Sequence, residues 1–293
     1  MHISAYWVRN KKTYIMEYEE KKQALKAYLL ELAEKDVVVA FSGGVDSSLM
    51  LRLCCDAAKQ KGTKVYAVTM QTGLHPHGDV DIARRVAEEA GAEHLVIQLN
   101  ELDEAGIRDN PLDRCYRCKR LLFAKLLGKA EQLGATYVVE GTNESDLHVY
   151  RPGIKALNEL GILSPLAKFN ITKPEVRQMA ADLGVSVARR ASTPCMVTRF
   201  PYNTRLTYED LERADKAEDW LRQQGFYNVR LRIHGEVVRI EIDEKDMGAL
   251  LLKREDVVSE LKKLGYTYIT LDMEGYRQGS MDIHIKPGYE GRL

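Results

Sequence analysis

The chain has 293 residues, 45% of them hydrophobic and 29% charged, which is typical of a globular protein with one large or two modest domains. Lys and Arg together number 43, as do Asp and Glu, so no global basic field points to a nucleic-acid partner. No apolar run is long enough to cross a bilayer, and residues 1–14 lack the apolar core of a signal peptide. We therefore expect a cytoplasmic protein with no membrane and no nucleic-acid partner.

The first two-thirds of the chain alternate between helical and strand-like segments. The strand-like runs are short, apolar and rich in β-branched residues, as in strands buried on both faces. In chain order, the predicted elements are a helix at 17–35, strand 37–41, helix 48–62, strand 64–70, helix 79–92, strand 94–99, helix 119–134, strand 137–143 and helix 172–184. This alternation predicts an α/β fold with a parallel sheet and helices on both faces.

The rest of the chain has a different pattern. Residues 187–205 form a polar, Pro-containing connection, and we expect a domain boundary after residue 203. A helix at 207–225, strands at 228–235 and 237–242, a helical segment at 244–264 and closing strands at 267–273 and 281–286 follow. Residues 204–293 are therefore predicted to form a small α+β module, and residues 1–15 an N-terminal extension.

The run "FSGGVDSSLM" (41–50) lies between the first buried strand and a helix start. Glycines at 43 and 44 allow a sharp turn and the close approach of an anion, and the helix N-terminus offers backbone N–H donors. Asp46 beside a phosphate site predicts a bridging divalent cation such as Mg²⁺. No Gly-Lys-Ser/Thr follows, so this is not a Walker A loop. The alternative, a serine-rich helix cap, is disfavoured by the complete pattern. The predicted phosphate-binding residues are Ser42, Gly43, Gly44, Asp46, Ser47 and Ser48.

The loop resembles that of the PP-loop ATP pyrophosphatase superfamily, over about residues 36–200. Members bind ATP with this loop, split it between the α- and β-phosphates, and transfer AMP to a carboxylate or amide oxygen. The resemblance implies ATP and Mg²⁺ as cofactors. It also implies nucleotide contacts from Met70, Gly141 and Asn143.

Three further motifs narrow the resemblance. "NPLDRCYRCKRLLF" (110–123), "GTNESDLHVYRPG" (141–153) and "STPCMVTRFPY" (192–202) together resemble the LarE family, the sulfur transferases of nickel-pincer nucleotide synthesis. The run at 229–242 resembles the small domain of that family, which is similar in fold to aminoimidazole ribonucleotide carboxylase. This implies an ATP pyrophosphatase domain at 16–203 and a domain for oligomerisation and substrate at 204–293. A homo-oligomer, such as a hexamer, is implied as well.

Five cysteines are too few for a disulfide scaffold in a chain of this length. Cys54 and Cys55 lie on an apolar helix and are interpreted as structural. Cys115 and Cys118 form a Cys-x-x-Cys motif after a Pro-containing loop and before a helix, and Cys195 lies in a Pro-flanked loop. A redox dithiol would not need Cys195, and a zinc site would need a fourth ligand. Three thiolates can hold a cubane iron–sulfur cluster, while unrelated thiols remain the alternative.

Resemblance sharpens the role of these thiols. LarE proteins that carry only the cysteine matching Cys195 donate its sulfur once, whereas those with the Cys-x-x-Cys motif look cluster-dependent. The resemblance therefore implies a four-iron four-sulfur (4Fe-4S) cluster on Cys115, Cys118 and Cys195, charged from a sulfide source. Cys195 and Asp46 are the predicted catalytic residues. Sacrifice of the Cys195 sulfur is the alternative mechanism.

The substrate that this resemblance implies is a pyridinium dicarboxylate mononucleotide, whose carboxylates become thiocarboxylates. Arg230 and Arg232 alternate along one predicted strand, so both side chains lie on one face and suit a phosphate group. A solvated strand face is the alternative interpretation. Arg199 is a further substrate-binding candidate. Rival functions are tRNA thiolation by an enzyme of the same superfamily, amide formation by a ligase, and non-enzymatic carriage of an iron–sulfur cluster.

Overall fold

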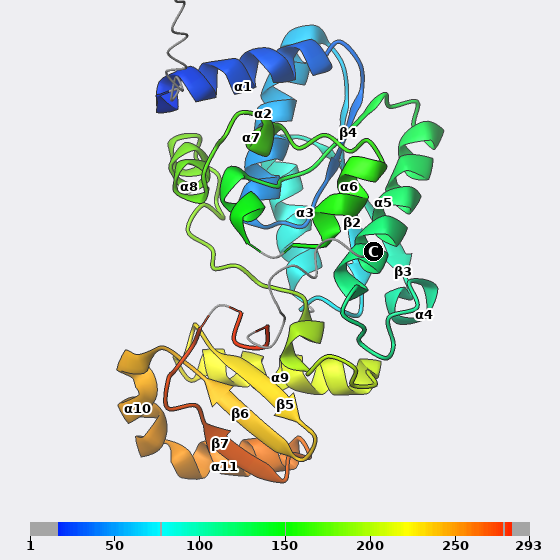
Figure 1. Ribbon diagram of the computed structural model, residues 1–293. Coiled ribbons are helices and arrows are strands. Elements are labelled where there is room, and N and C mark those ends of the chain that lie inside the picture. Colours follow the sequence, from blue (N-terminus) through cyan, green and yellow to red (C-terminus); the bar gives the residue numbers. More distant parts are fainter. Residues whose placement is uncertain (1–16, 77, 150, 278, 283–293) are drawn as a thin grey trace, which may run out of the picture.

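The computed structural model describes residues 17–76, 78–149, 151–277 and 279–282 (Figure 1). The predicted extension at 1–15 lies outside these residues. Figure 1 shows two lobes, with elements α1 to α8 in the larger one and α9 to α11 in the smaller one. Within the described residues no helix combines the length and the apolar character needed to cross a membrane.

A four-stranded parallel sheet forms the centre of the larger lobe, as predicted. Its strands lie in the order β3-β2-β1-β4. Strand β4, which comes from the second half of the lobe, is therefore the neighbour of β1. The register pairs Val37 with Val65 and with Tyr137. The strands are β1 (Val37–Ala40), β2 (Val65–Thr72), β3 (Glu93–Leu99) and β4 (Tyr137–Val139). Strand β4 is shorter than predicted because the backbone N–H of Glu140 bonds to Leu163 O, 2.9 Å away, instead of to a neighbouring strand.

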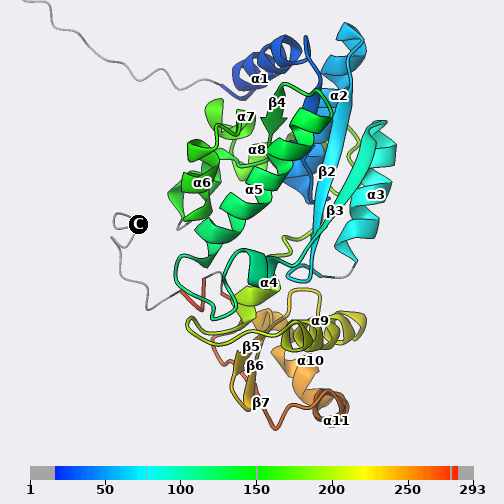
Figure 2. The same ribbon diagram turned by 90° about the vertical axis from the view of Figure 1, so that its right-hand side faces the viewer.

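Helices cover both faces of this sheet, and Figure 2 shows α5 and α6 on the side of the strands opposite α3. Because side chains alternate along a strand, Val37 and Val39 pack into one core and Val38 into the other. The first core contains α1 (Tyr18–Leu32), α2 (Val45–Lys61), α3 (Asp79–Ala90) and α8 (Lys173–Asp182). The second contains α5 (Arg114–Gln132) and α6 (Gly153–Glu159). The predicted α/β fold class is therefore confirmed.

Short helical segments connect these elements in the larger lobe. They are α4 (Glu101–Glu104), η1 (Glu144–His148) and α7 (Pro165–Lys168). The predicted cap of α8 is present, because Thr172 and Glu175 form a reciprocal capping box and Gly184 follows with a φ of 70°.

The smaller lobe is the predicted α+β module. Strands β5 and β6 pair in antiparallel fashion, whereas β6 and β7 are parallel. Its elements are α9 (Tyr208–Gln223), β5 (Arg230–His234), β6 (Val237–Glu241), η3 (Glu244–Asp246), α10 (Met247–Leu252), α11 (Arg254–Lys263) and β7 (Tyr268–Leu271). Of the last predicted strand, residues 281 and 282 lie in a turn, and residues 283–286 lie outside the described part.

The two lobes share a hydrophobic core. Leu74 and Leu102, which follow β2 and β3 of the larger lobe, pack in one cluster with Leu231 and Ile240 of the small sheet. The connection joins the same cluster through the turn η2 (Met196–Arg199). The loops at the carboxyl ends of the large sheet are thus fixed against the smaller lobe. The boundary after residue 203 stays a prediction.

Candidate active site

A cavity of about 1060 Å³ lies at the carboxyl ends of the four parallel strands. The loop after β1, the ends of β2 and β3 and the turn after β4 line it, together with the start of α5 and residues 190–195. This is the edge of an open α/β sheet where ligands bind. The smaller lobe is adjacent, because η2 contributes Thr198 to the lining.

The predicted phosphate loop forms one wall of this cavity. Gly43 has a φ of 70°, and a Cβ there would lie 3.0 Å from the backbone of Ala83 in α3, so only glycine fits. The Ser47 hydroxyl donates to Gly44 O over 3.1 Å and accepts from the Ser42 N–H over 3.3 Å. These bonds fold the loop over the N-terminus of α2, where backbone donors are concentrated.

Most of the predicted nucleotide-binding residues lie on the cavity surface. Those that line it are Ser42, Gly44, Asp46, Ser47, Met70 and Gly141. Gly43, Ser48 and Asn143 stand behind the lining. Gly141 brings the turn after β4 against α2, since a Cβ there would lie 2.8 Å from Ser47 N. The nucleotide contacts themselves stay a prediction.

Asp46 has two partners that the sequence did not point to. Lys173 Nζ lies 2.5 Å from Asp46 Oδ2, and Asn143 Nδ2 donates to Asp46 Oδ1 over 3.0 Å. Lys173 was missed because its only local signal is its place in the first turn of α8. The carboxylate oxygens of Asp46 are hard donors of the kind that Mg²⁺ takes together with phosphate oxygens and water, so this residue fits the predicted cation.

Besides Lys173, a second basic side chain, that of Arg190, lies beside the phosphate loop. Arg190 donates to Gly43 O over 3.3 Å and pairs with Asp79 at the start of α3, 2.5 Å away. Both Arg190 and Lys173 line the cavity. Two cations next to a donor-rich loop can stabilise the negative charge of a polyphosphate.

Two of the three candidate thiols lie on the wall of the same cavity, and the third lies nearby. Cys115 and Cys195 line it, and Cys118 lies behind them, where its Sγ donates to Glu101 Oε1. Cys115 and Cys118 were expected before the helix but lie inside it, because α5 begins at Arg114, whose N–H bonds to Pro111 O. The predicted start of this helix was therefore wrong, being about one turn too late.

Glu101 is the neighbour of the thiols that the sequence did not reveal. Its side chain is fully buried, and its Oε2 has no hydrogen-bond partner among the described residues. Burial, and next the negative charge of Glu101, raise the pKa of Cys118 well above its usual range and that of Cys195 to about 12. Both thiols are therefore protonated at neutral pH when no metal is bound.

Cysteine thiolates are the donors that iron–sulfur clusters take, so the three thiols have the right chemistry for the predicted cluster. In the described part of the chain, no three His, Cys, Asp or Glu side chains are close enough to hold one ion. The thiols are nevertheless within electrostatic range, because a charge on Cys115 raises the pKa of Cys195 and a charge on Cys195 raises that of Cys118. Cys115 and Cys195 face the cavity and Cys118 lies behind them, so the fit to such a cluster rests on the chemistry of three soft thiol donors. Cys54 is buried and Cys55 half-buried in α2, away from this set.

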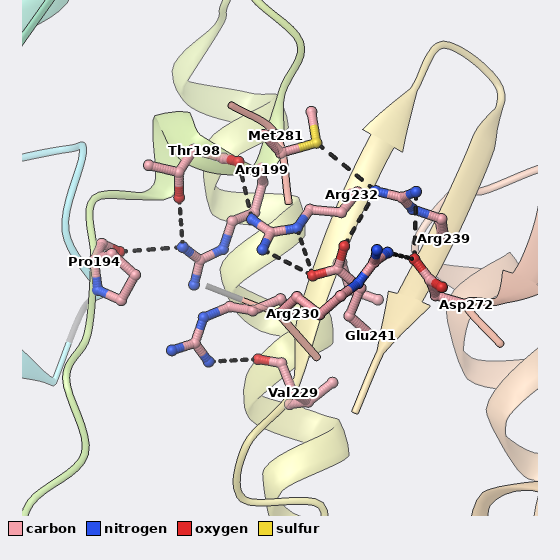
Figure 3. A network of polar contacts seen from close by, with 12 residues as sticks. Pro194, Thr198, Arg199, Val229, Arg230, Arg232, Arg239, Glu241, Asp272 and Met281 are labelled. Carbon is pink, nitrogen blue, oxygen red and sulfur yellow. Dashed lines mark hydrogen bonds and ion pairs between the residues drawn. The ribbon is translucent and has the colours of Figure 1, made fainter. Parts of the chain in front are cut away.

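The arginines predicted to bind substrate form a buried network between η2, which carries Arg199, and β5, which carries Arg230 and Arg232 (Figure 3). Arg199 makes two 2.7 Å bonds to Glu218, and Arg232 lies 2.8 Å from Glu241. Arg230 donates to two backbone carbonyls, Val229 O and Ser192 O. None of the three is among the described residues that line the cavity. Their role in substrate binding stays a prediction.

The same network also forms hydrogen bonds to residues 192–198, the segment that carries Cys195. Arg199 Nη1 donates to Pro194 O over 3.2 Å, and Arg232 Nη1 donates to Thr198 O over 3.0 Å (Figure 3). With the bond from Arg230 to Ser192 O, three buried arginines hold residues 192–198 from the side of the smaller lobe. The geometry thus connects the small domain to the position of the Cys195 thiol.

Comparison with known proteins agrees with this geometry. The NAD synthase family matches residues 17–112, which contain the phosphate loop. The pyridinium-3,5-bisthiocarboxylic acid mononucleotide synthase of Lactiplantibacillus plantarum is 36% identical over 262 residues, 89% of this chain and 94% of that protein. The chain belongs to the LarE family. LarE proteins are ATP-dependent sulfur-inserting enzymes of the PP-loop superfamily, and this chain is an enzyme of that kind.

Two further relatives have the same extent. An uncharacterized protein of Synechocystis is 36% identical over 266 residues, 90% of this chain and 97% of that protein. An uncharacterized protein of Methanocaldococcus jannaschii is 28% identical over 243 residues, 83% of this chain and 91% of that protein. Sequence similarity to these relatives therefore extends over most of the chain and includes residues of both lobes.

Proposed function

We propose that this LarE protein adenylates the carboxylates of a pyridinium dicarboxylate mononucleotide and converts them to thiocarboxylates during nickel-pincer nucleotide synthesis. The observation that carries the proposal is that Ser47 of the phosphate loop and Cys195 line the same cavity. Activation by ATP needs an acceptor, and the thiols of the same cavity provide a place from which sulfur reaches the activated carbon. A redox dithiol or an amide ligase would not use this combination.

The first step is the transfer of AMP. The substrate carboxylate attacks the α-phosphorus of ATP, the bond to the β-phosphate oxygen breaks, and pyrophosphate leaves. The loop N–H groups, Lys173 and Arg190 stabilise the charge that develops on the phosphates. Asp46 would hold Mg²⁺ against the leaving group. The resulting acyl-adenylate has an electrophilic carbonyl carbon with AMP as its leaving group.

The second step is the attack of sulfur on that carbon. Cys115, Cys118 and Cys195 would hold the 4Fe-4S cluster. When bound, such a cluster supplies an iron without a protein ligand, which can carry an added sulfide. Cys118 and Cys195 also pack against the hydrophobic core that the two lobes share, which fixes the segments that carry them. Two carboxylates require two rounds of adenylation and sulfur transfer. The alternative is that Cys195 gives up its own sulfur.

The phosphate-loop assignment is tested with Asp46→Asn. This change removes the charge of the carboxylate but keeps its shape, so we expect pyrophosphate release to be abolished. Any cluster absorbance should be intact, because Asp46 is not among the proposed cluster ligands. Retained pyrophosphate release would count against the metal role of Asp46.

The sulfur route is tested on anaerobically purified protein. We expect about four irons and labile sulfides per chain from cluster stoichiometry, with loss of iron in Cys115→Ser. Intact-protein mass spectrometry after turnover should show Cys195 unchanged. Absence of iron and sulfide, together with loss of hydrogen sulfide mass from Cys195, would establish the sacrificial mechanism instead.

The remaining expectations concern partners. We propose a cytoplasmic homo-oligomer that does not bind nucleic acid. Light scattering on the purified chain measures its mass in solution, and a monomer would contradict the oligomer. A mobility shift with bulk tRNA tests the rival thiolation function, and saturable binding would support that rival.

A further inference from the structure

Arg114 is a buried cation on the cavity wall that the function above leaves without a task. It is the first residue of α5, directly before Cys115, and its side chain is only 5% exposed. It lines the cavity together with Cys115 and Cys195. Its positive charge acts on the Cys195 thiol, whose pKa it lowers against the larger effects of burial and Glu101.

One buried donor of the Arg114 guanidinium has no partner among the described residues. Its Nη1 is buried and has no hydrogen-bond partner within the described ranges, and no carboxylate there forms an ion pair with it. Arg199 and Arg232, by contrast, are each paired with a glutamate. A buried charged donor without an acceptor is costly. The simplest reason for the protein to keep such a donor is that a bound ligand supplies the acceptor.

The orientation of this guanidinium is fixed from one side. The Tyr202 ring lies 4.0 Å from Arg114 Cζ in a cation–π contact, and the Tyr202 hydroxyl donates to Asp282 over 2.9 Å. A guanidinium plane held on an aromatic ring keeps its edge free to form hydrogen bonds. That edge suits the two oxygens of a carboxylate, which arginine binds in a bidentate manner.

We propose that Arg114 binds a carboxylate of the substrate at the thiol end of the cavity. This rests on the proposed function, which gives the substrate two ring carboxylates and one phosphate. A carboxylate is favoured over the phosphate because Arg114 is next to Cys115 and shares the cavity wall with Cys195, where the ring carboxyl groups must be for sulfur transfer. One carboxylate held here directs the ring, so that the other faces the phosphate loop.

Binding to the full-length chain by calorimetry tests this, with pyridine-3,5-dicarboxylate and inorganic phosphate as separate probes. Arg114→Gln should weaken dicarboxylate binding by about 10- to 100-fold, as expected for loss of a charged hydrogen-bonding partner. Phosphate and ATP binding should not change. Arg114→Lys, which keeps the charge but loses the planar fork, should fall between Arg114→Gln and the wild type. Arg205→Gln is the matched control, since Arg205 is exposed and pairs with Asp109 at the surface.

Several outcomes decide the matter. Unchanged dicarboxylate affinity in both Arg114 variants would overturn the assignment. Loss of phosphate affinity instead would mean that Arg114 binds the phosphate group of the substrate. Arg114→Lys keeps the test valid if Arg114→Gln does not fold, as judged by circular dichroism. If the wild type binds dicarboxylate through Arg114 but makes no thiolated product, the proposed function fails while this inference stands. If it makes product and the Arg114 variants bind like the wild type, only this inference fails.

Discussion

Two regions of this protein contain buried arginines, and they differ in what balances the positive charge. Where η2 meets the smaller lobe, buried Arg199 and Arg232 are paired with Glu218 and Glu241. On the cavity wall, Arg114 is as deeply buried but has no carboxylate partner in the described residues. The difference shows that burial alone does not mark an arginine as structural. What separates the two regions is whether the protein or a ligand supplies the anion.

The largest effect is expected from breaking the paired region. Glu218 accepts hydrogen bonds from Arg199, Arg222 and the Leu231 N–H, and it is fully buried. Glu218→Gln leaves Arg199 without a buried counter-charge and should lower the free energy of unfolding by about 3–5 kcal/mol. Urea unfolding measures this. Asp219→Asn, a change at the exposed partner of Arg222, should cost less than about 0.5 kcal/mol. Equal effects of the two would contradict the comparison.

The same pair predicts a dependence of stability on pH. Burial by itself would raise the pKa of Glu218, but the charge and hydrogen bonds of Arg199 outweigh it and lower the pKa below its usual range. A lowered carboxyl pKa contributes stability above the unfolded pKa of about 4.3, which is lost as the pH falls through the folded value. The deficit of Glu218→Gln against the wild type should therefore shrink below about pH 4. A stability deficit that stays the same from about pH 3 to about pH 7 would contradict this prediction.

In the cavity, the next effect is expected on catalysis instead of stability. Lys173→Gln removes the cation beside Asp46 and should reduce pyrophosphate release by about 100- to 1000-fold, as for loss of one group that stabilises the transition state. Lys216→Gln, on the exposed face of α9, is the control and should not change the rate. A Lys173 variant with the wild-type rate would remove Lys173 from the phosphate site.

Smaller effects distinguish a glycine that supports the cavity from one that does not. Gly141→Ala places a methyl group 2.8 Å from Ser47 N and should cost about 1–3 kcal/mol and weaken ATP binding. Gly128→Ala lies inside α5, where a Cβ meets nothing within 4 Å, and should stabilise the protein by about 1 kcal/mol. Thermal unfolding with and without ATP compares the two. Equal changes in stability for the two variants would mean that the close approach of Gly141 to Ser47 does not restrict the side chain at position 141.

The parts of the fold that depend on local pattern could be predicted from the sequence. The alternation of strands and helices and the phosphate loop lie in continuous segments, so spacing alone indicates them. Lys173, Arg190 and Glu101 could not be predicted, because each meets its site only through the packing of distant elements. The start of α5 was placed too late because Pro111 O, not a side-chain signal, begins the helix at Arg114.

The arginines illustrate the same limit. The alternation of Arg230 and Arg232 predicted a shared strand face, but the carboxylates that meet this region come from elsewhere. Glu218 is on α9 and Glu241 is on β6. A single sequence gives no sign of which distant carboxylate pairs with which arginine. For Arg114 the sequence shows the neighbouring thiols Cys115 and Cys118, but only the structure shows that its Nη1 has no hydrogen-bond partner among the described residues.

The central claim is that ATP activation and sulfur transfer occur in one cavity. Its most direct measurement is mass spectrometry of the nucleotide after anaerobic incubation of the reconstituted enzyme with ATP, Mg²⁺, sulfide and the pyridinium dicarboxylate mononucleotide. We expect a product in which carboxyl oxygen is replaced by sulfur, with AMP and pyrophosphate formed in equal amounts to each other and to the sulfur inserted. Formation of AMP and pyrophosphate without any thiolated nucleotide, under conditions where iron and sulfide are bound, would contradict the claim.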